Sequence, residues 1–111
     1  MPRAIMVTYS DPADPSREEE YRAWYDRHIK EALEAVPGMP RAVRYKLSAK
    51  QGHPVNEPFR HMTIYEIDTD DVDELHRKLS EAWEQNRLSR SDVITAGPVV
   101  YWDFDSEISI L

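Results

Sequence analysis

The feature that most constrains the fold is residues 21–38, YRAWYDRHIKEALEAVPG, which carry the strongest helix signal in the chain. Its apolar side chains recur on one arc of a helical wheel, as expected for a helix with one buried face, at Tyr21, Tyr25, Ile29, Ala32 and Val36. Ser16 and Glu19 have the spacing of a capping box, which predicts where the helix begins. Pro37 and Gly38 predict its end, because proline disfavours helical geometry before it and glycine permits a sharp reversal.

Composition restricts the class of protein. A chain of 111 residues, 41% hydrophobic and 32% charged, is the size of one globular domain over residues 1–111. No apolar run approaches the roughly 20 residues of a membrane span, and the first residues lack a signal-peptide core, so we expect a cytoplasmic protein. The absence of cysteine excludes disulfides, thiolate catalysis and iron–sulfur clusters. A net charge of −7 disfavours nucleic acid as a partner.

The remaining segments predict a sheet and a second helix. Strand-like alternation occurs in four places, residues 4–9, 39–50, 59–67 and 99–104. The second helix should be capped by Thr69 or Asp70 and bury Val72, Leu75, Leu79 and Trp83. Loops are expected at residues 10–15, 51–58 and 86–98, and the tail 105–111 could extend the sheet or swap onto a partner.

The predicted order βαββαβ is the ferredoxin-like pattern, an α+β fold with two helices on one face of a four-stranded antiparallel sheet. Right-handed crossovers place the first and third strands in the centre, and residues 39–50 alternate like an edge strand. Both residue sets of the first strand, Ile5 with Val7 and Ala4 with Met6, are apolar. One of them would therefore be exposed on the open sheet face, and we expect a homodimer through these sheet faces.

Three short motifs carry a resemblance to a known family. They are residues 24–29 (WYDRHI), 36–38 (VPG) and 58–68 (PFRHMTIYEID). In these the chain resembles the EthD-like proteins of the dimeric α+β barrel superfamily. That superfamily includes polyketide cyclases, muconolactone-type isomerases, cofactor-free monooxygenases and haem-degrading enzymes. The resemblance implies a pocket between sheet and helices, with functional histidines at the positions of His28 and His61.

Those two histidines are the main catalytic candidates. A neutral imidazole can take or give a proton near pH 7, as enolisation of a carbonyl compound requires. His28 could equally be a residue at a helix margin that only packs on Trp24. His61 could share a pocket-facing side of its strand with Thr63 and Tyr65, or the opposite parity could aim it into the dimer interface.

Further candidates would bind the substrate. Tyr9 or Tyr65 could donate a hydrogen bond to a developing enolate. An apolar pocket could be walled by the aromatic residues Trp24, Tyr25, Phe59 and Trp83, with Thr63 as a polar neighbour. Arg44 could bind a substrate carboxylate or simply be a charge on an edge strand. Each aromatic residue is also a plausible member of the core.

We expect no metal and no organic cofactor. His28, His61 and Asp26 could supply metal ligands, but Asp26 lies about 160° around the helix from His28. Haem-degrading relatives combine an Asn with a Trp and a His, whereas this chain has Thr8 or Tyr9 at the corresponding place. His53, in a loop, and His76, on a charged helix flank, are discounted.

The sequence therefore predicts a small cofactor-independent enzyme acting on a hydrophobic, aromatic or polyketide-like carbonyl compound. His61 and His28 would serve as base and acid in a cyclisation, isomerisation or lactone reaction. The alternatives are a monooxygenase or haem-binding protein, and a non-catalytic protein that binds a small hydrophobic ligand. In any of these the 51–58 loop could act as a lid.

Overall fold

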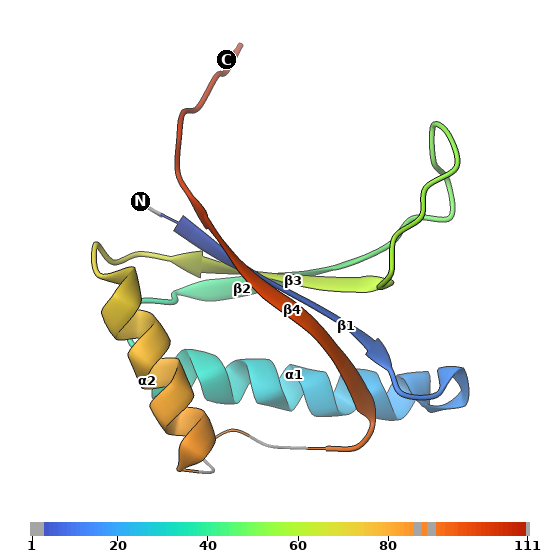
Figure 1. Ribbon diagram of the computed structural model, residues 1–111, viewed down its shortest axis with the longest axis horizontal. Coiled ribbons are helices and arrows are strands. Elements are labelled where there is room, and N and C mark those ends of the chain that lie inside the picture. The colour runs from blue at the N-terminus through green and yellow to red at the C-terminus, as the bar shows by residue number, and fades with distance from the viewer. Residues whose placement is uncertain (1–3, 86–87, 89–90, 111) are drawn as a thin grey trace.

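The computed structural model describes residues 4–85, 88 and 91–110, and these form one sheet with two helices on one of its faces (Figure 1). The elements in chain order are β1 (Ala4–Pro12), a 3₁₀ turn (Pro15–Arg17), α1 (Glu18–Ala35), β2 (Arg41–Lys46), β3 (His61–Ile67), α2 (Val72–Glu84) and β4 (Ile94–Asp103). The strands are antiparallel in the order β2-β3-β1-β4. The predicted ferredoxin-like order is confirmed, with β1 and β3 central and β2 at an edge.

One face of the sheet packs on the helices. Thr8 pairs with Thr63 and Ser10 with His61, so these side chains share a face of β1 and β3. All four are buried or half-buried. The main core lies between this face and both helices and includes Met6, Tyr65, Ile67, Ala32, Val36 and Leu75. His61 therefore points towards the helices, and the alternative that it points into a sheet–sheet interface is wrong.

The opposite face of the sheet, here called the outer face, is mainly apolar, with the ion pair of Arg41 and Glu66 at one end. The strand register places on it Ile5, Val7, Val43, Tyr45, Met62, Ile64, Val100 and Trp102. Tyr45 is 53% exposed and Trp102 57% exposed. Neither α1 nor α2 covers this face, and the β2–β3 loop and the C-terminal segment, residues 104–110, both project to its side (Figure 1).

The helix starts differ from the prediction. Asp14 accepts a hydrogen bond from the Ser16 N–H at 2.9 Å and caps the 3₁₀ turn, so Ser16 lies inside that turn. The predicted capping box of Ser16 and Glu19 is therefore wrong, and α1 begins at Glu18 without a side-chain cap. Three glutamates in its first turn still stabilise the start of α1, because their negative charges lie at the positive end of the helix dipole.

The start of α2 is also displaced. Asp71 accepts from the Glu74 N–H at 3.0 Å, so it is the cap in place of Thr69 or Asp70. The Thr69 hydroxyl instead accepts from the Asp71 N–H at 3.2 Å.

Neither helix in the described part of the chain is both long and apolar enough to cross a lipid bilayer.

Strand β4 begins well before the predicted residue 99. It pairs Ala96 with Ser10 and Ile94 with Pro12, across a register shift in which β4 has an extra residue. Gly97 and Pro98 lie at this bulge, where an edge strand tolerates a proline that cannot donate a hydrogen bond. The predicted loop 86–98 is therefore wrong from Ile94 onwards, and residues 86–87 and 89–90 lie outside the described residues.

The other strands differ mainly in length. The predicted strands at residues 39–50 and 59–67 shorten to Arg41–Lys46 and His61–Ile67, while β1 continues to Pro12. The described tail residues 104–110 form no strand. Ile108 and Ile110 are almost fully exposed. Exchange of this tail with a partner remains a prediction.

Candidate functional site

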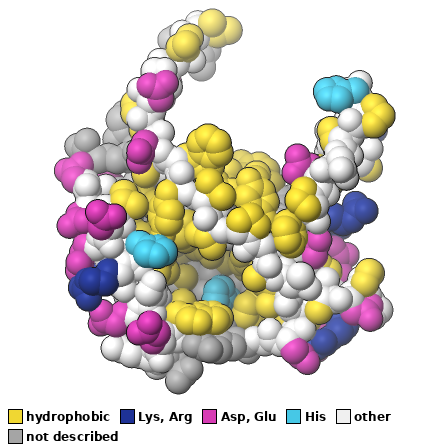
Figure 2. Space-filling model, viewed as in Figure 1, with side chains coloured by type: hydrophobic (Ala, Val, Ile, Leu, Met, Phe, Trp, Pro, Cys, Tyr) yellow, Lys and Arg dark blue, Asp and Glu magenta, His cyan; other side chains and the backbone are white. Residues whose placement is uncertain are grey.

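The candidate site is a pocket of about 360 Å³ between the sheet and both helices. Its floor comes from β1 and β3 and includes Met6, Thr8 and Tyr65, whereas its helical walls include Tyr25 and His28 of α1 and Leu79 and Trp83 of α2. Figure 2 shows this side of the molecule hollowed below the apolar sheet residues, with histidine side chains in the hollow and beside it. The pocket is thus largely apolar, with a few polar groups that converge on it, as in many small-molecule sites.

His28, in the pocket wall formed by α1, is surrounded by aromatic side chains. Its ring stacks on Trp24 with centroids 4.8 Å apart. It meets the edges of Tyr25 at 5.9 Å and Trp83 at 6.3 Å. Trp24 itself is buried behind His28 and does not line the pocket. The four-residue spacing on α1 makes the stack possible, and packing against α2 adds the second wall.

Tyrosine hydroxyls supply polar groups to the pocket. The Tyr25 hydroxyl and Thr8 Oγ1 are hydrogen-bonded at 3.0 Å, which joins α1 to the floor. Tyr65 is 3% exposed, and burial raises the pKa of its hydroxyl well above the usual range. The Tyr65 hydroxyl is therefore neutral at pH 7 and can donate a hydrogen bond; its predicted role towards an enolate stays a prediction.

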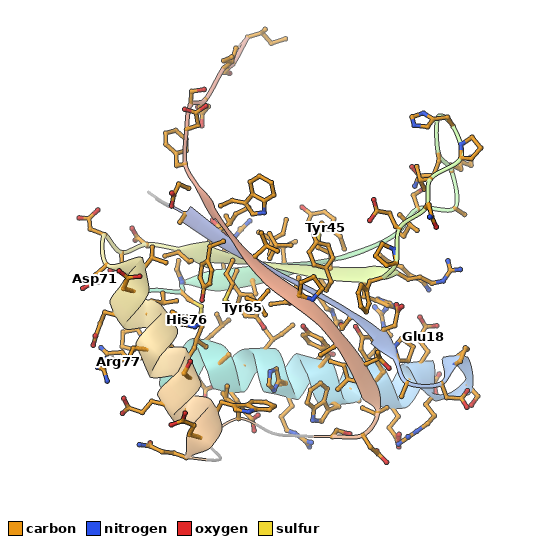
Figure 3. All side chains as sticks on the ribbon, in the orientation of Figure 1. Glu18, Tyr45, Tyr65, Asp71, His76 and Arg77 are labelled. Carbon is orange, nitrogen blue, oxygen red and sulfur yellow. The ribbon has the colours of Figure 1, made fainter. Side chains whose placement is uncertain are left out.

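Two polar residues that the sequence analysis left out of the site also line the pocket. The His76 Nδ1 and the Tyr101 hydroxyl are 2.7 Å apart, which ties α2 to β4. Figure 3 shows His76 of α2 and Tyr65 of β3 on the same side of the sheet. His76, which the sequence analysis discounted, therefore lines the same pocket as His28. The three-residue spacing of His76 and Leu79 on α2 could have indicated that both lie on the same side of the helix. The position of Tyr101 opposite His76 could not be predicted without the register of β4.

His61 lies elsewhere. Its ring packs on Tyr21 with centroids 5.0 Å apart, and its Nε2 is 3.4 Å from Glu18 Oε1. It lines two other hollows, both shared with Lys46 and Arg60. His28 is seven residues further along α1 than Tyr21, a rise of about 10 Å. The expectation that His28 and His61 share one cavity is wrong, because they line different pockets.

Four other predicted site residues also lie outside the pocket that His28 lines. Tyr9 and Phe59 line a hollow at the β2–β3 loop, away from His28. Arg44 pairs with Asp26 of α1 at 2.7 Å, so its carboxylate partner is internal. Thr63 is buried and is not among the pocket residues. Within the described residues, no group of three histidine, aspartate or glutamate side chains is placed to hold a metal ion.

Comparison with known proteins gives structural relatives only. No protein-family model and no curated protein matches the sequence. Among solved structures, HapK from Hahella chejuensis matches with a TM-score of 0.57 and 10% identity, over 97% of this chain and 98% of that one. An ethyl tert-butyl ether degradation (EthD) family protein from Bacillus halodurans matches with a TM-score of 0.54 and 12% identity, over 90% of this chain and 97% of that one. The chain has an EthD-like fold.

These matches, at 10% and 12% identity, confirm the predicted ferredoxin-like α+β fold and its likeness to EthD-like structures. They do not transfer an activity, because one fold supports many unrelated reactions. The function has to be argued from the pocket itself.

Proposed function

We propose that the pocket binds a small hydrophobic carbonyl compound, aromatic or polyketide-like, and that His28 moves a proton on the carbon next to the carbonyl. The observation that carries this proposal is the position of His28 in the pocket wall, between Trp24 and Trp83. Flat aromatic walls favour a flat aromatic ligand. The reaction class is isomerisation or cyclisation through an enol.

The chemistry requires a base and a partner for the carbonyl oxygen. His28 would take the proton from the α-carbon, the electron pair of that bond would form the enol double bond, and the carbonyl oxygen would become an enolate. A neutral hydroxyl beside it stabilises that charge, and Tyr65 on the pocket floor is one such group. Return of the proton to another carbon, or attack of the enol on a second carbonyl, would complete the reaction.

Deuterium exchange tests this proposal without knowledge of the natural substrate. β-Tetralone is an aromatic ketone whose α-protons exchange in deuterium oxide when a base is held next to them, and proton NMR follows the loss. We expect the protein to accelerate exchange and His28→Gln to reduce the acceleration about 100-fold or more. His53→Gln, in the exposed β2–β3 loop, is the control and should exchange like the wild type. Equal rates for the wild type and His28→Gln would overturn the catalytic assignment.

The separation of His61 from the pocket favours a second candidate function, non-catalytic binding of the same class of ligand. A single histidine in an apolar pocket can orient a ligand through one hydrogen bond and do no more. Binding of β-tetralone without accelerated exchange, seen as quenching of tryptophan fluorescence, would support this candidate.

We also propose that two copies of the chain associate through the outer face. The exposed aromatic side chains of Tyr45 and Trp102 support this, because a monomer would leave them against water. Two outer faces packed together would form an apolar layer between sheets. The β2–β3 loop and the C-terminal segment, which project to this side, would then lie beside the partner (Figure 1).

A further inference from the structure

The pocket has a second polar group, in the wall that α2 and β4 form. His76 and Tyr101 are 25 residues apart in the sequence, and their Nδ1 and hydroxyl oxygen are 2.7 Å apart. Both line the same pocket as His28. The Tyr101 ring packs against the main core, and its hydroxyl group extends from that packing to the exposed His76.

We infer that Tyr101 is a catalytic residue of the proposed reaction, donating its hydroxyl proton to the substrate's carbonyl oxygen, and that His76 is the positioning residue that holds and reprotonates it. This inference rests on the proposed function. His28, in the wall formed by α1, would take the proton from carbon. Tyr101, in the wall formed by α2 and β4, would give a proton to the carbonyl oxygen.

The contacts of the other hydroxyls support this choice of donor. The Tyr25 hydroxyl is paired with Thr8 across the pocket floor. Tyr65 is almost completely buried, whereas Tyr101 is only half-buried. Burial raises the pKa of Tyr101, so its hydroxyl carries a proton at neutral pH. Of these three tyrosines, Tyr101 is the half-buried one whose hydroxyl is hydrogen-bonded to a histidine at the pocket rim.

The exposure of His76 gives the relay a connection to solvent. His76 is an exposed residue of α2, at the rim of the pocket. When the enol forms, the imidazole of His28 gains the α-proton and the substrate oxygen gains the Tyr101 proton. The Tyr101 oxygen then takes a proton from His76 Nδ1. These transfers reverse when His28 gives its proton to carbon and the enol oxygen returns its proton to Tyr101, whose oxygen returns one to His76. Protons balance in this sequence, and no oxidant or cofactor is needed.

This arrangement also defines the ligand class more narrowly. The oxygen of the ligand must reach the rim near α2 while its ring lies against Leu79 and Trp83. A fused aromatic ketone, or the phenol that resembles its enol, fits that description. β-Naphthol is such an enol analogue, and naphthalene is the same ring system without the oxygen.

The affinities of these two probes test the inference, with β-naphthol fluorescence and competition by naphthalene as readouts. We expect Tyr101→Phe to weaken β-naphthol binding about tenfold and to leave naphthalene binding within about twofold, because one hydrogen bond to the oxygen is lost. His76→Gln should show the same selective loss, to a smaller extent. Tyr45→Phe on the outer face is the matched control and should change neither affinity.

Three results would overturn the inference. Tyr101→Phe and His76→Gln could both bind β-naphthol like the wild type, both variants could weaken the two probes equally, or the wild type could show no preference for β-naphthol. Failure of the proposed function has a different signature, in which His28→Gln leaves deuterium exchange unchanged. The two measurements therefore separate an incorrect oxygen donor from an incorrect base.

Discussion

The imidazole of His28 lies stacked on the indole of Trp24, with ring centroids 4.8 Å apart and planes 24° apart. Trp24 is 8% exposed, so the indole is part of the core while the imidazole on top of it reaches the pocket. The stack fixes the ring of His28 on one wall of the cavity. It therefore connects the packing of α1 with the geometry of the proposed base.

Loss of this stack should affect both stability and ligand binding. Trp24→Leu removes a large buried ring and is expected to lower the free energy of unfolding by about 2–4 kcal/mol, measured by urea denaturation. β-Tetralone should also bind more weakly, because His28 loses its support. Trp24→Phe keeps an aromatic surface and should lose less on both counts. Identical losses for Leu and Phe would show that stacking on His28 is unimportant.

A buried hydrogen bond joins β1 to α1 at the other end of the helix. Ser10 Oγ and the Tyr21 hydroxyl are 2.6 Å apart, and burial raises the pKa of Tyr21 to about 12. Ser10→Ala and Tyr21→Phe should each cost about 1–2 kcal/mol, because each leaves one buried group unpaired. The double variant should cost less than the sum, since it leaves neither group unpaired. Additive losses in urea denaturation would contradict a direct bond.

The environment of His61 predicts a pH dependence of stability. Burial lowers the pKa of His61 below its usual value of 6.5, although Asp11 and Glu18 oppose the shift. The unfolded chain therefore binds this proton at a higher pH than the folded chain does. The stabilising contribution is present above about pH 6.5 and is lost as the pH falls through the folded pKa.

His61→Gln removes the titrating group, so its stability should change less between about pH 7 and 5 than that of the wild type. His53→Gln is the control and should keep the wild-type dependence. The measurement is the free energy of unfolding at several pH values. An unchanged slope in His61→Gln would contradict the burial of a neutral imidazole.

Gly38 has a conformation that other residues avoid. Its φ is +101°, and a Cβ there would lie 3.4 Å from the Thr69 Cγ2, an ordinary contact. Gly38→Ala should therefore lower the free energy of unfolding by about 1–2 kcal/mol through backbone strain alone. Gly52→Ala is the matched control, because nothing lies within 4 Å of a Cβ at Gly52. Thermal denaturation of the two variants should differ, and equal midpoints would contradict the strain.

Association through the outer face can be broken by one charge. Trp102→Glu places a carboxylate in the proposed interface, and burying it unpaired would cost several times the thermal energy. We expect sedimentation velocity at micromolar concentration to show dimers for the wild type and monomers for Trp102→Glu. Lys30→Gln changes the net charge by the same amount at an exposed position of α1 and should remain dimeric. A monomeric wild type would contradict the proposed dimer.

The sequence was sufficient for the elements and their order. The period of apolar residues in 21–38 predicted α1, and the reversal at Gly38 predicted its end, because both are local properties of the chain. Strand alternation likewise predicted that His61, Thr63 and Tyr65 share one face of β3. The structure shows that this face of β3 turns towards the helices, where Tyr65 lines one pocket with His28, Tyr25 and Trp83.

The composition of the pocket depended on tertiary structure. His61 of β3 packs beside Tyr21 of α1, about two helical turns away from His28. No local pattern in the sequence predicts this separation of the two histidines. The contact between His76 and Tyr101 depends on how α2 packs on the sheet and on the β4 register across a bulge. The sequence alone determined which side chains share one face of an element, such as His61, Thr63 and Tyr65, because that follows from the period of the element itself. Only the packing of distant elements decided which of these side chains meet.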